Sequence, residues 1–141
     1  LYDTFEGFDS SLLQKNEISS VSDFYEYSSS FQTVKRTFRK YPYVLLVKGS
    51  VPSSLERQAP KKVCFLSIDM NCVNPEIAAF QFFWPRLVPG GVVLLDDYGF
   101  QRHLPQKLAF DALSRKMRFQ IMQLPTGQAL ILKPAFIRGT S

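Results

Sequence analysis

The sequence contains few of the residues that disulfide, zinc and histidine-based sites require. Among 141 residues there are two cysteines, Cys64 and Cys72, and one histidine, His103. Two cysteines are too few for a disulfide scaffold, and their spacing matches no common zinc motif. We therefore expect two reduced thiols in a cytoplasmic protein, with Cys64 buried in its apolar run.

Long apolar runs and clustered glycines are also absent. No apolar stretch approaches the ~20 residues of a membrane helix, and no basic-then-apolar leader is present. The seven glycines form no GxGxxG-like cluster, and the sequence has no P-loop. These absences predict no membrane partner and argue against a P-loop enzyme. The chain opens on Leu1 within a strand-like segment, which indicates a fragment whose upstream part is missing.

The net charge of the chain is +5, and one cluster of basic residues is the main feature of its charge pattern. Lys35, Arg36, Arg39 and Lys40 would share one face of a helix, which is usually a solvated face. The other basic residues are scattered. We therefore expect no nucleic-acid partner, and phosphate binding by this basic cluster is the alternative.

Apolar runs and helical periodicities alternate along the chain. The hydrophobic content of 45%, with 13 Phe, is typical of a globular α/β protein. Strands are predicted at residues 1–5, 43–49, 63–69, 92–97, 119–124 and 128–133. Helices are predicted at residues 30–40 and 105–116. A third predicted helix has Asn74 as its N-cap and ends before residues 89–91. In the helix at 105–116, Leu108, Ala109, Ala112 and Leu113 are expected to face the core.

The order of these elements predicts one architecture. The apolar runs are continuous, which indicates strands covered on both faces. We expect a Rossmann-like, mostly parallel, doubly wound sheet that closes with a C-terminal β-hairpin. The whole chain, 1–141, is predicted to be a single partial domain, in which the polar segment 9–30 is a loop or a lid.

Acidic residues follow several of the predicted strands. Asp3, Asp69 and the pair Asp96–Asp97 all come at strand ends, where ligands bind in such sheets. Asp3 is placed to accept the hydroxyls of a ribose. Three carboxylates without Cys or His at ligand spacing suit Mg²⁺, which could hold vicinal hydroxyls of a substrate. The alternative for a single acid such as Asp97 is a helix N-cap.

Five segments in register make the chain resemble the macrocin O-methyltransferase family. They are Asp3-Thr4-Phe5-Glu6-Gly7-Phe8, Leu66-Ser67-Ile68-Asp69-Met70-Asn71, Phe83-Trp84-Pro85-Arg86-Leu87-Val88-Pro89-Gly90-Gly91, Asp96-Asp97-Tyr98-Gly99 and Leu124-Pro125-Thr126-Gly127-Gln128. The resemblance covers nearly the whole chain. It implies a class I methyltransferase fold, S-adenosylmethionine as the methyl donor, and a divalent metal that orients a sugar or another hydroxylated small molecule.

The resemblance also assigns roles to residues. It implies donor contacts at Asp3, Thr4, Gly49 and Asp69, with Asp3 on the ribose. It implies metal binding by Asp69, Asp96 and Asp97, with Asp69 as the general base. His103 is an alternative base because its ordinary pKa lies near neutrality, although a lone histidine is often a surface or capping residue. Tyr98 follows the acids and could line the acceptor pocket.

The chain departs from the family pattern at two places. The opening strand and glycine-rich turn that hold the methionine end of the donor are not in this sequence. Members that act on antibiotic sugars carry Asp and Tyr shortly after the first metal-binding acid, whereas the run here is Asn71-Cys72-Val73-Asn74. The carbonyl oxygen of Asn71 can still serve as a metal ligand but carries less charge, which indicates a different acceptor or weaker metal binding. An exposed flank left by the missing strand would favour a homo-oligomer.

Two other functions remain open from the sequence. The first is a truncated or degenerate methyltransferase-like domain without catalytic activity. The second is a Mg²⁺-dependent phosphotransferase or phosphohydrolase that uses the aspartates; the lack of a P-loop and of an Asp-x-Asp motif at a first strand counts against it.

Overall fold

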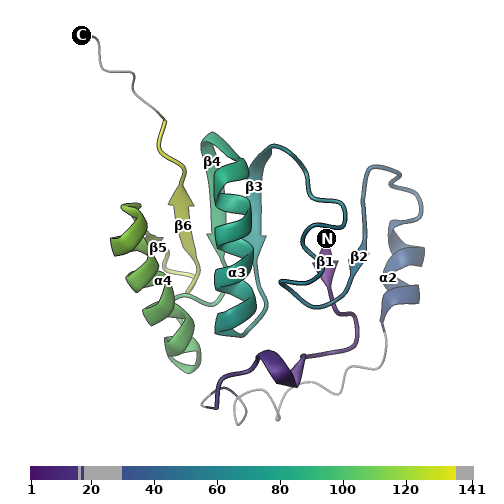
Figure 1. Ribbon diagram of the computed structural model, residues 1–141, viewed down its shortest axis with the longest axis horizontal. Helices are drawn as coiled ribbons and strands as arrows, with labels where there is room; N and C mark the ends of the chain where they lie inside the picture. The colour runs from purple at the N-terminus through teal and green to yellow at the C-terminus, as the bar shows by residue number, and fades with distance from the viewer. Residues whose placement is uncertain (16, 18–29, 136–141) are drawn as a thin grey trace. The chain divides into compact units, whose positions relative to one another are not determined.

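The computed structural model describes residues 1–15, 17 and 30–135 (Figure 1). The chain divides into two compact units, Leu1–Ala59 and Pro60–Ser141. Within the described residues, no helix combines the length and apolar character that a membrane crossing requires.

The first unit is built on a short parallel strand pair. Strand β1 (Tyr2–Asp3) pairs with β2 (Val47–Lys48), so that Asp3 lies opposite Lys48. The predicted strand at 43–49 is therefore correct in place but too long. Tyr43 is 78% exposed, and a turn occupies the start of the predicted range.

Helix α2 (Phe31–Phe38) confirms the helix predicted at 30–40. Its first residue packs edge-on against buried Phe5, with ring centroids 5.1 Å apart. A 3₁₀ helix, η1 (Ser10–Leu12), opens the segment that was predicted as a loop or lid. Most of that segment, at 16 and 18–29, lies outside the described residues.

The second unit contains a four-stranded mixed sheet in the order β3-β4-β6-β5. Strand β3 (Val63–Ile68) runs parallel to β4 (Leu87–Leu95). Strand β6 (Ala129–Leu132) is antiparallel to both β4 and β5 (Met122–Gln123). The predicted α/β class and the C-terminal hairpin are confirmed.

Helices α3 (Val73–Phe83) and α4 (Leu104–Met117) lie on the same face of this sheet (Figure 1). The core between helices and sheet includes Phe80 and Phe110, whose rings meet edge-on at 5.6 Å. In the second half of β4 and along β6, alternate residues are buried in this core, and Val93 and Ile131 are fully buried.

The prediction that both faces of the strands are covered is wrong for this sheet. Phe65 and Leu132 are 57% and 58% exposed, and both align with Val92 across the sheet. They lie on the face opposite the buried Val93 row. Cys64 is likewise exposed, not buried as expected, while Cys72 is buried. A continuous apolar run does not by itself show that both faces of a strand are covered.

Two details of the helices also differ from the prediction. Helix α3 begins at Val73 with Cys72 as its N-cap, so Asn74 lies inside the helix. After the short 3₁₀ helix η2 (Trp84–Arg86), β4 already starts at Leu87 and contains residues 89–91. These glycines continue the ladder, because Gly90 and Gly91 exchange backbone hydrogen bonds with Lys133.

Helix α4 is rotated relative to the predicted orientation. Its buried residues are Gln106, Phe110 and Leu113, whereas Leu108 is 58% exposed and Ala112 is also exposed. The aromatic ring of Phe110 offers more apolar area to the core than the alanines do, so the helix turns this residue inward.

Candidate functional site

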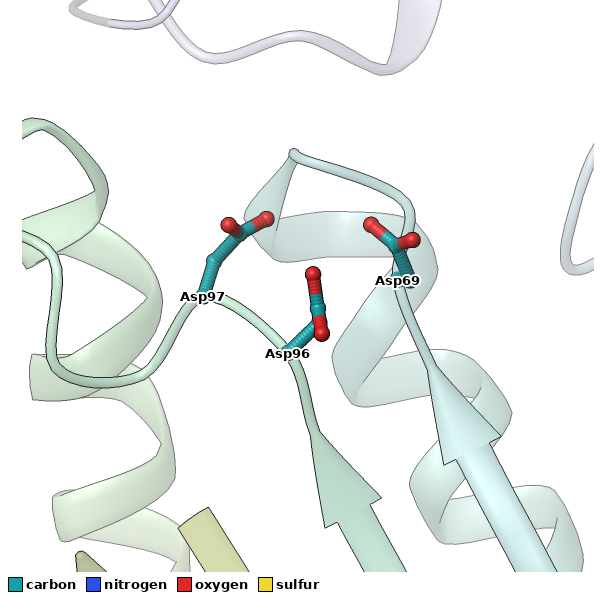
Figure 2. Close-up of side chains that lie close together, drawn as sticks. All are labelled: Asp69, Asp96 and Asp97. Carbon is teal, nitrogen blue, oxygen red and sulfur yellow. The ribbon is translucent and has the colours of Figure 1, made fainter. Parts of the chain in front are cut away.

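Three aspartates meet at the carboxyl ends of the two parallel strands of the second unit. Asp69 directly follows β3, and Asp96 and Asp97 directly follow β4. The Asp96 amide donates to the carbonyl of Ile68 at 3.1 Å, which holds the two strand ends side by side. One carboxylate oxygen from each aspartate lies within 4.8 Å of the others, and Figure 2 shows Asp96 between Asp69 and Asp97.

This cluster is electrostatically unfavourable without a counter-charge. The Asp97 side chain is only 13% exposed, and its Oδ2 is buried without a hydrogen-bond partner among the described residues. Desolvation raises the pKa of Asp97; the neighbouring charges of Asp69 and Asp96 raise it further, while His103 and Arg102 lower it. Three converging carboxylates with an unsatisfied buried oxygen fit a hard divalent cation such as Mg²⁺.

His103 lies beside the cluster, at the end of the 3₁₀ helix η3 (Gln101–His103). Its Nε2 is 3.8 Å from Asp97 Oδ1, and its Nδ1 is 2.9 Å from the Gln106 amide nitrogen. Because that amide nitrogen can only donate, Nδ1 accepts, and Nε2 carries the hydrogen that faces Asp97. Both ring nitrogens of His103 therefore face protein groups. This geometry suits a histidine that orients the Asp97 carboxylate.

Glu76 is a buried acid that the sequence reasoning missed. It lies in the first turn of α3, is 4% exposed, and accepts a hydrogen bond at 3.3 Å from the backbone amide of Met70. Burial raises its pKa to about 8; the charges of Asp97 and Asp69 add to the rise, and the amides of Met70 and Asn71 oppose it. An acidic residue early in a helix whose other residues are largely apolar was the available signal.

Asn71 shapes the turn between Asp69 and α3. Its φ of 57° is in the left-handed region, which asparagine tolerates better than most residues. Its side-chain amide donates to Asp69 Oδ1 at 3.3 Å. In the structure this side chain thus presents its nitrogen to Asp69, whereas the sequence suggested its carbonyl oxygen as a metal ligand.

Tyr98, the predicted acceptor-pocket residue, is 7% exposed. Its hydroxyl donates to Asp111 on α4 and accepts from Lys107 at 2.9 Å. Burial, and then the hydrogen bond to Asp111, raises the pKa of Tyr98. These contacts fasten the loop after β4 to α4, and the acceptor role of Tyr98 stays a prediction.

The predicted donor-binding residues of the first unit also lie together. Asp3 is the last residue of β1 and Gly49 directly follows β2, and the Gly49 amide donates to the carbonyl of Asp3 at 2.9 Å. Asp3 is exposed, and its Oδ1 accepts from the Phe5 amide at 2.6 Å and from Thr4 Oγ1 at 3.5 Å. An exposed carboxylate at the end of a parallel strand fits ribose hydroxyls. The aspartate cluster lies in the other unit.

Comparisons with known proteins give one family and one fold. The family model of macrocin-O-methyltransferase (TylF) matches residues 1–118. The solved O-methyltransferase NovP is similar at 17% identity and a TM-score of 0.79, over 95% of this chain and 59% of that one. CalS11, a calicheamicin methyltransferase, is similar at 18% identity and a TM-score of 0.66, over 93% and 58%. Among curated proteins, none matches. The chain thus spans somewhat over half the length of these solved structures.

Proposed function

Because the chain belongs to the macrocin-O-methyltransferase family, we propose that it carries part of an S-adenosylmethionine-dependent, Mg²⁺-assisted O-methyltransferase for a hydroxylated small molecule. The observation that supports this most is the cluster of Asp69, Asp96 and Asp97 at the carboxyl ends of parallel strands, with an unpaired buried oxygen on Asp97. A sugar or another natural product is the proposed acceptor class, since CalS11 is named as a calicheamicin methyltransferase.

The reaction needs a donor, an acceptor hydroxyl and a place for one proton. S-adenosylmethionine would supply the methyl group, and Mg²⁺ would lower the pKa of the hydroxyl. Asp3, with Thr4 and Gly49 beside it, would hold the ribose of the donor. Asp96 and Asp97 would hold the metal with Asp69. The bound donor would transfer its methyl group from sulfur to the acceptor oxygen, and the Asp69 carboxylate would take the proton of the hydroxyl.

Asp69 is our preferred base because it is the exposed member of the cluster, whereas both nitrogens of His103 face protein groups. A base must reach the hydroxyl from which it takes the proton. His103 would instead keep the Asp97 carboxylate in place.

Calorimetric titration of S-adenosylhomocysteine into the purified protein, with and without Mg²⁺, tests donor binding. We expect saturable binding, and we expect Asp3→Asn to weaken it by roughly 10- to 100-fold, because a hydrogen bond to a charged group is lost. Glu56→Gln, a change at an exposed acid, is the control and should bind normally. If the wild-type protein binds no S-adenosylhomocysteine, the donor assignment is wrong, and the degenerate-domain alternative gains support.

The choice of base predicts unequal effects of two substitutions. With a panel of vicinal diols and sugars as acceptors, Asp69→Asn should lower kcat by about 10²- to 10⁴-fold, and His103→Gln by much less. Excess Mg²⁺ should not restore Asp69→Asn, whereas it would do so if Asp69 only bound the metal. A larger loss for His103→Gln would transfer the role of base to the histidine.

A further inference from the structure

Gln128 links the C-terminal hairpin to the aspartate cluster. Its side-chain amide nitrogen donates to Asp96 Oδ1 at 2.7 Å. The sheet register explains this contact: Leu95 pairs with Ala129 in antiparallel strands, so the next positions along each strand, Asp96 and Gln128, also lie opposite each other. The contact therefore follows from the strand pairing and not from a chance approach of surface side chains.

A second contact holds the Gln128 amide in place. The hydroxyl of Thr126, in the hairpin turn, donates to Gln128 Oε1 at 3.1 Å. Because the Asp96 carboxylate can only accept, the amide presents its NH₂ group to Asp96 and its oxygen to the Thr126 hydroxyl. Reversing the amide would place its oxygen against the Asp96 carboxylate oxygen, which only accepts, so the contact with Asp96 fixes the direction of the amide.

Backbone contacts also hold the hairpin turn against the loop that follows β4. The Gly99 amide donates to the carbonyl of Gly127 at 2.6 Å, and the Leu124 amide donates to the carbonyl of Gln128 at 2.8 Å. A Cβ at residue 99 would lie 2.8 Å from the Gly127 oxygen, which is backbone and cannot swing aside. Only glycine at position 99 allows this approach, so the backbone that carries Gln128 is closely fixed relative to Asp96.

We propose that Gln128 is a positioning residue that engages Asp96 Oδ1 and thereby leaves Oδ2 for a divalent cation shared with Asp69 and Asp97. The inference rests on the proposed metal-assisted function. A neutral amide suits this task, because it orders the carboxylate without bringing a positive charge that would compete with the ion. Thr126 acts one step further out, because its hydroxyl bonds the amide oxygen and holds the side chain in place.

Titration of Mn²⁺, followed by calorimetry and by the Mn²⁺ electron paramagnetic resonance signal, tests the proposal without any turnover. Gln128→Ala should weaken Mn²⁺ binding by about 10- to 100-fold, as removal of a partner behind a metal ligand usually does. Gln128→Glu should weaken it at least as much, because a second carboxylate would face Asp96. Gln120→Ala, a change at an exposed glutamine outside the hairpin turn, is the matched control and should bind Mn²⁺ normally.

Thr126→Val separates positioning from simple structural support. Thr126 is exposed, so the variant should unfold in EDTA at the wild-type urea midpoint, yet it should still bind Mn²⁺ several-fold more weakly. Normal Mn²⁺ affinity in both Gln128→Ala and Thr126→Val would refute the role of Gln128 and leave the metal site intact. Failure of the wild-type protein to bind Mn²⁺ or Mg²⁺ would instead refute the metal part of the proposed function, and this inference with it.

Discussion

Replacing Asp97 with asparagine is expected to weaken divalent-cation binding by at least about 100-fold, more than a change behind a ligand usually does. The same substitution should make the metal-free protein more stable at pH 7. Desolvation and the charges of Asp69 and Asp96 raise the folded-state pKa of Asp97, so the ionised side chain opposes folding above its ordinary pKa. The gain should vanish at pH values below the pKa of the unfolded state, where the carboxyl is protonated in both states.

A substitution that weakens cation binding but raises the stability of the metal-free protein indicates a functional site and not a structural ion cluster. Calorimetry with Mn²⁺ at pH 7 would measure the affinity, and urea unfolding in EDTA at pH 3 and pH 7 would measure the stability. Asp111→Asn is the matched control, because Asp111 bonds Tyr98 and Lys107 on the far side of the loop. It should lower stability and leave cation affinity unchanged. If Asp97→Asn lost stability at pH 7 and kept its affinity, the cluster would be structural.

The parts of the site that the sequence predicted are those set by strand ends. Asp69, Asp96 and Asp97 could be placed together, because parallel strands bring their carboxyl ends to one edge of a sheet. The run of apolar residues before each acid was sufficient to locate these strands. Asp3 and Gly49 were brought together by the same logic, although β1 and β2 each have only two paired residues.

The groups around the aspartates could not be predicted in the same way. The contact of Gln128 with Asp96 depends on the register of β4 and β6, and a shift of one residue would turn the side chain to the other face. The predicted core side of α4 was right for Leu113 but wrong for Leu108 and Ala112, because helical spacing alone did not rank Phe110 above them. Glu76 was missed because an acid in the first turn of a helix is ordinarily exposed, where it interacts with the helix dipole.

Glu76 should make the stability of the protein fall as pH rises. Its pKa is about 8 in the folded state and 4.5 in an ordinary carboxyl, so the folded state holds a proton that the unfolded state releases between these values. The contribution of Glu76 to stability should therefore be fully present below about pH 4.5 and decline up to about pH 8, by at most about 5 kcal/mol. Glu76→Gln should remove that decline, because the amide copies the neutral acid and can still accept from the Met70 amide.

Urea unfolding in EDTA between pH 5 and pH 8.5 would show the effect as a difference between two curves. At pH 5 the wild-type protein and Glu76→Gln should unfold at similar midpoints, and by pH 8 the variant should be clearly more stable. Glu56→Gln, at an exposed site, should follow the wild-type curve throughout. A variant that is less stable at every pH would mean that Glu76 is ionised and compensated in the folded protein. Its carboxylate would then be a fourth negative charge behind the cluster, and the site would need a cation even more strongly.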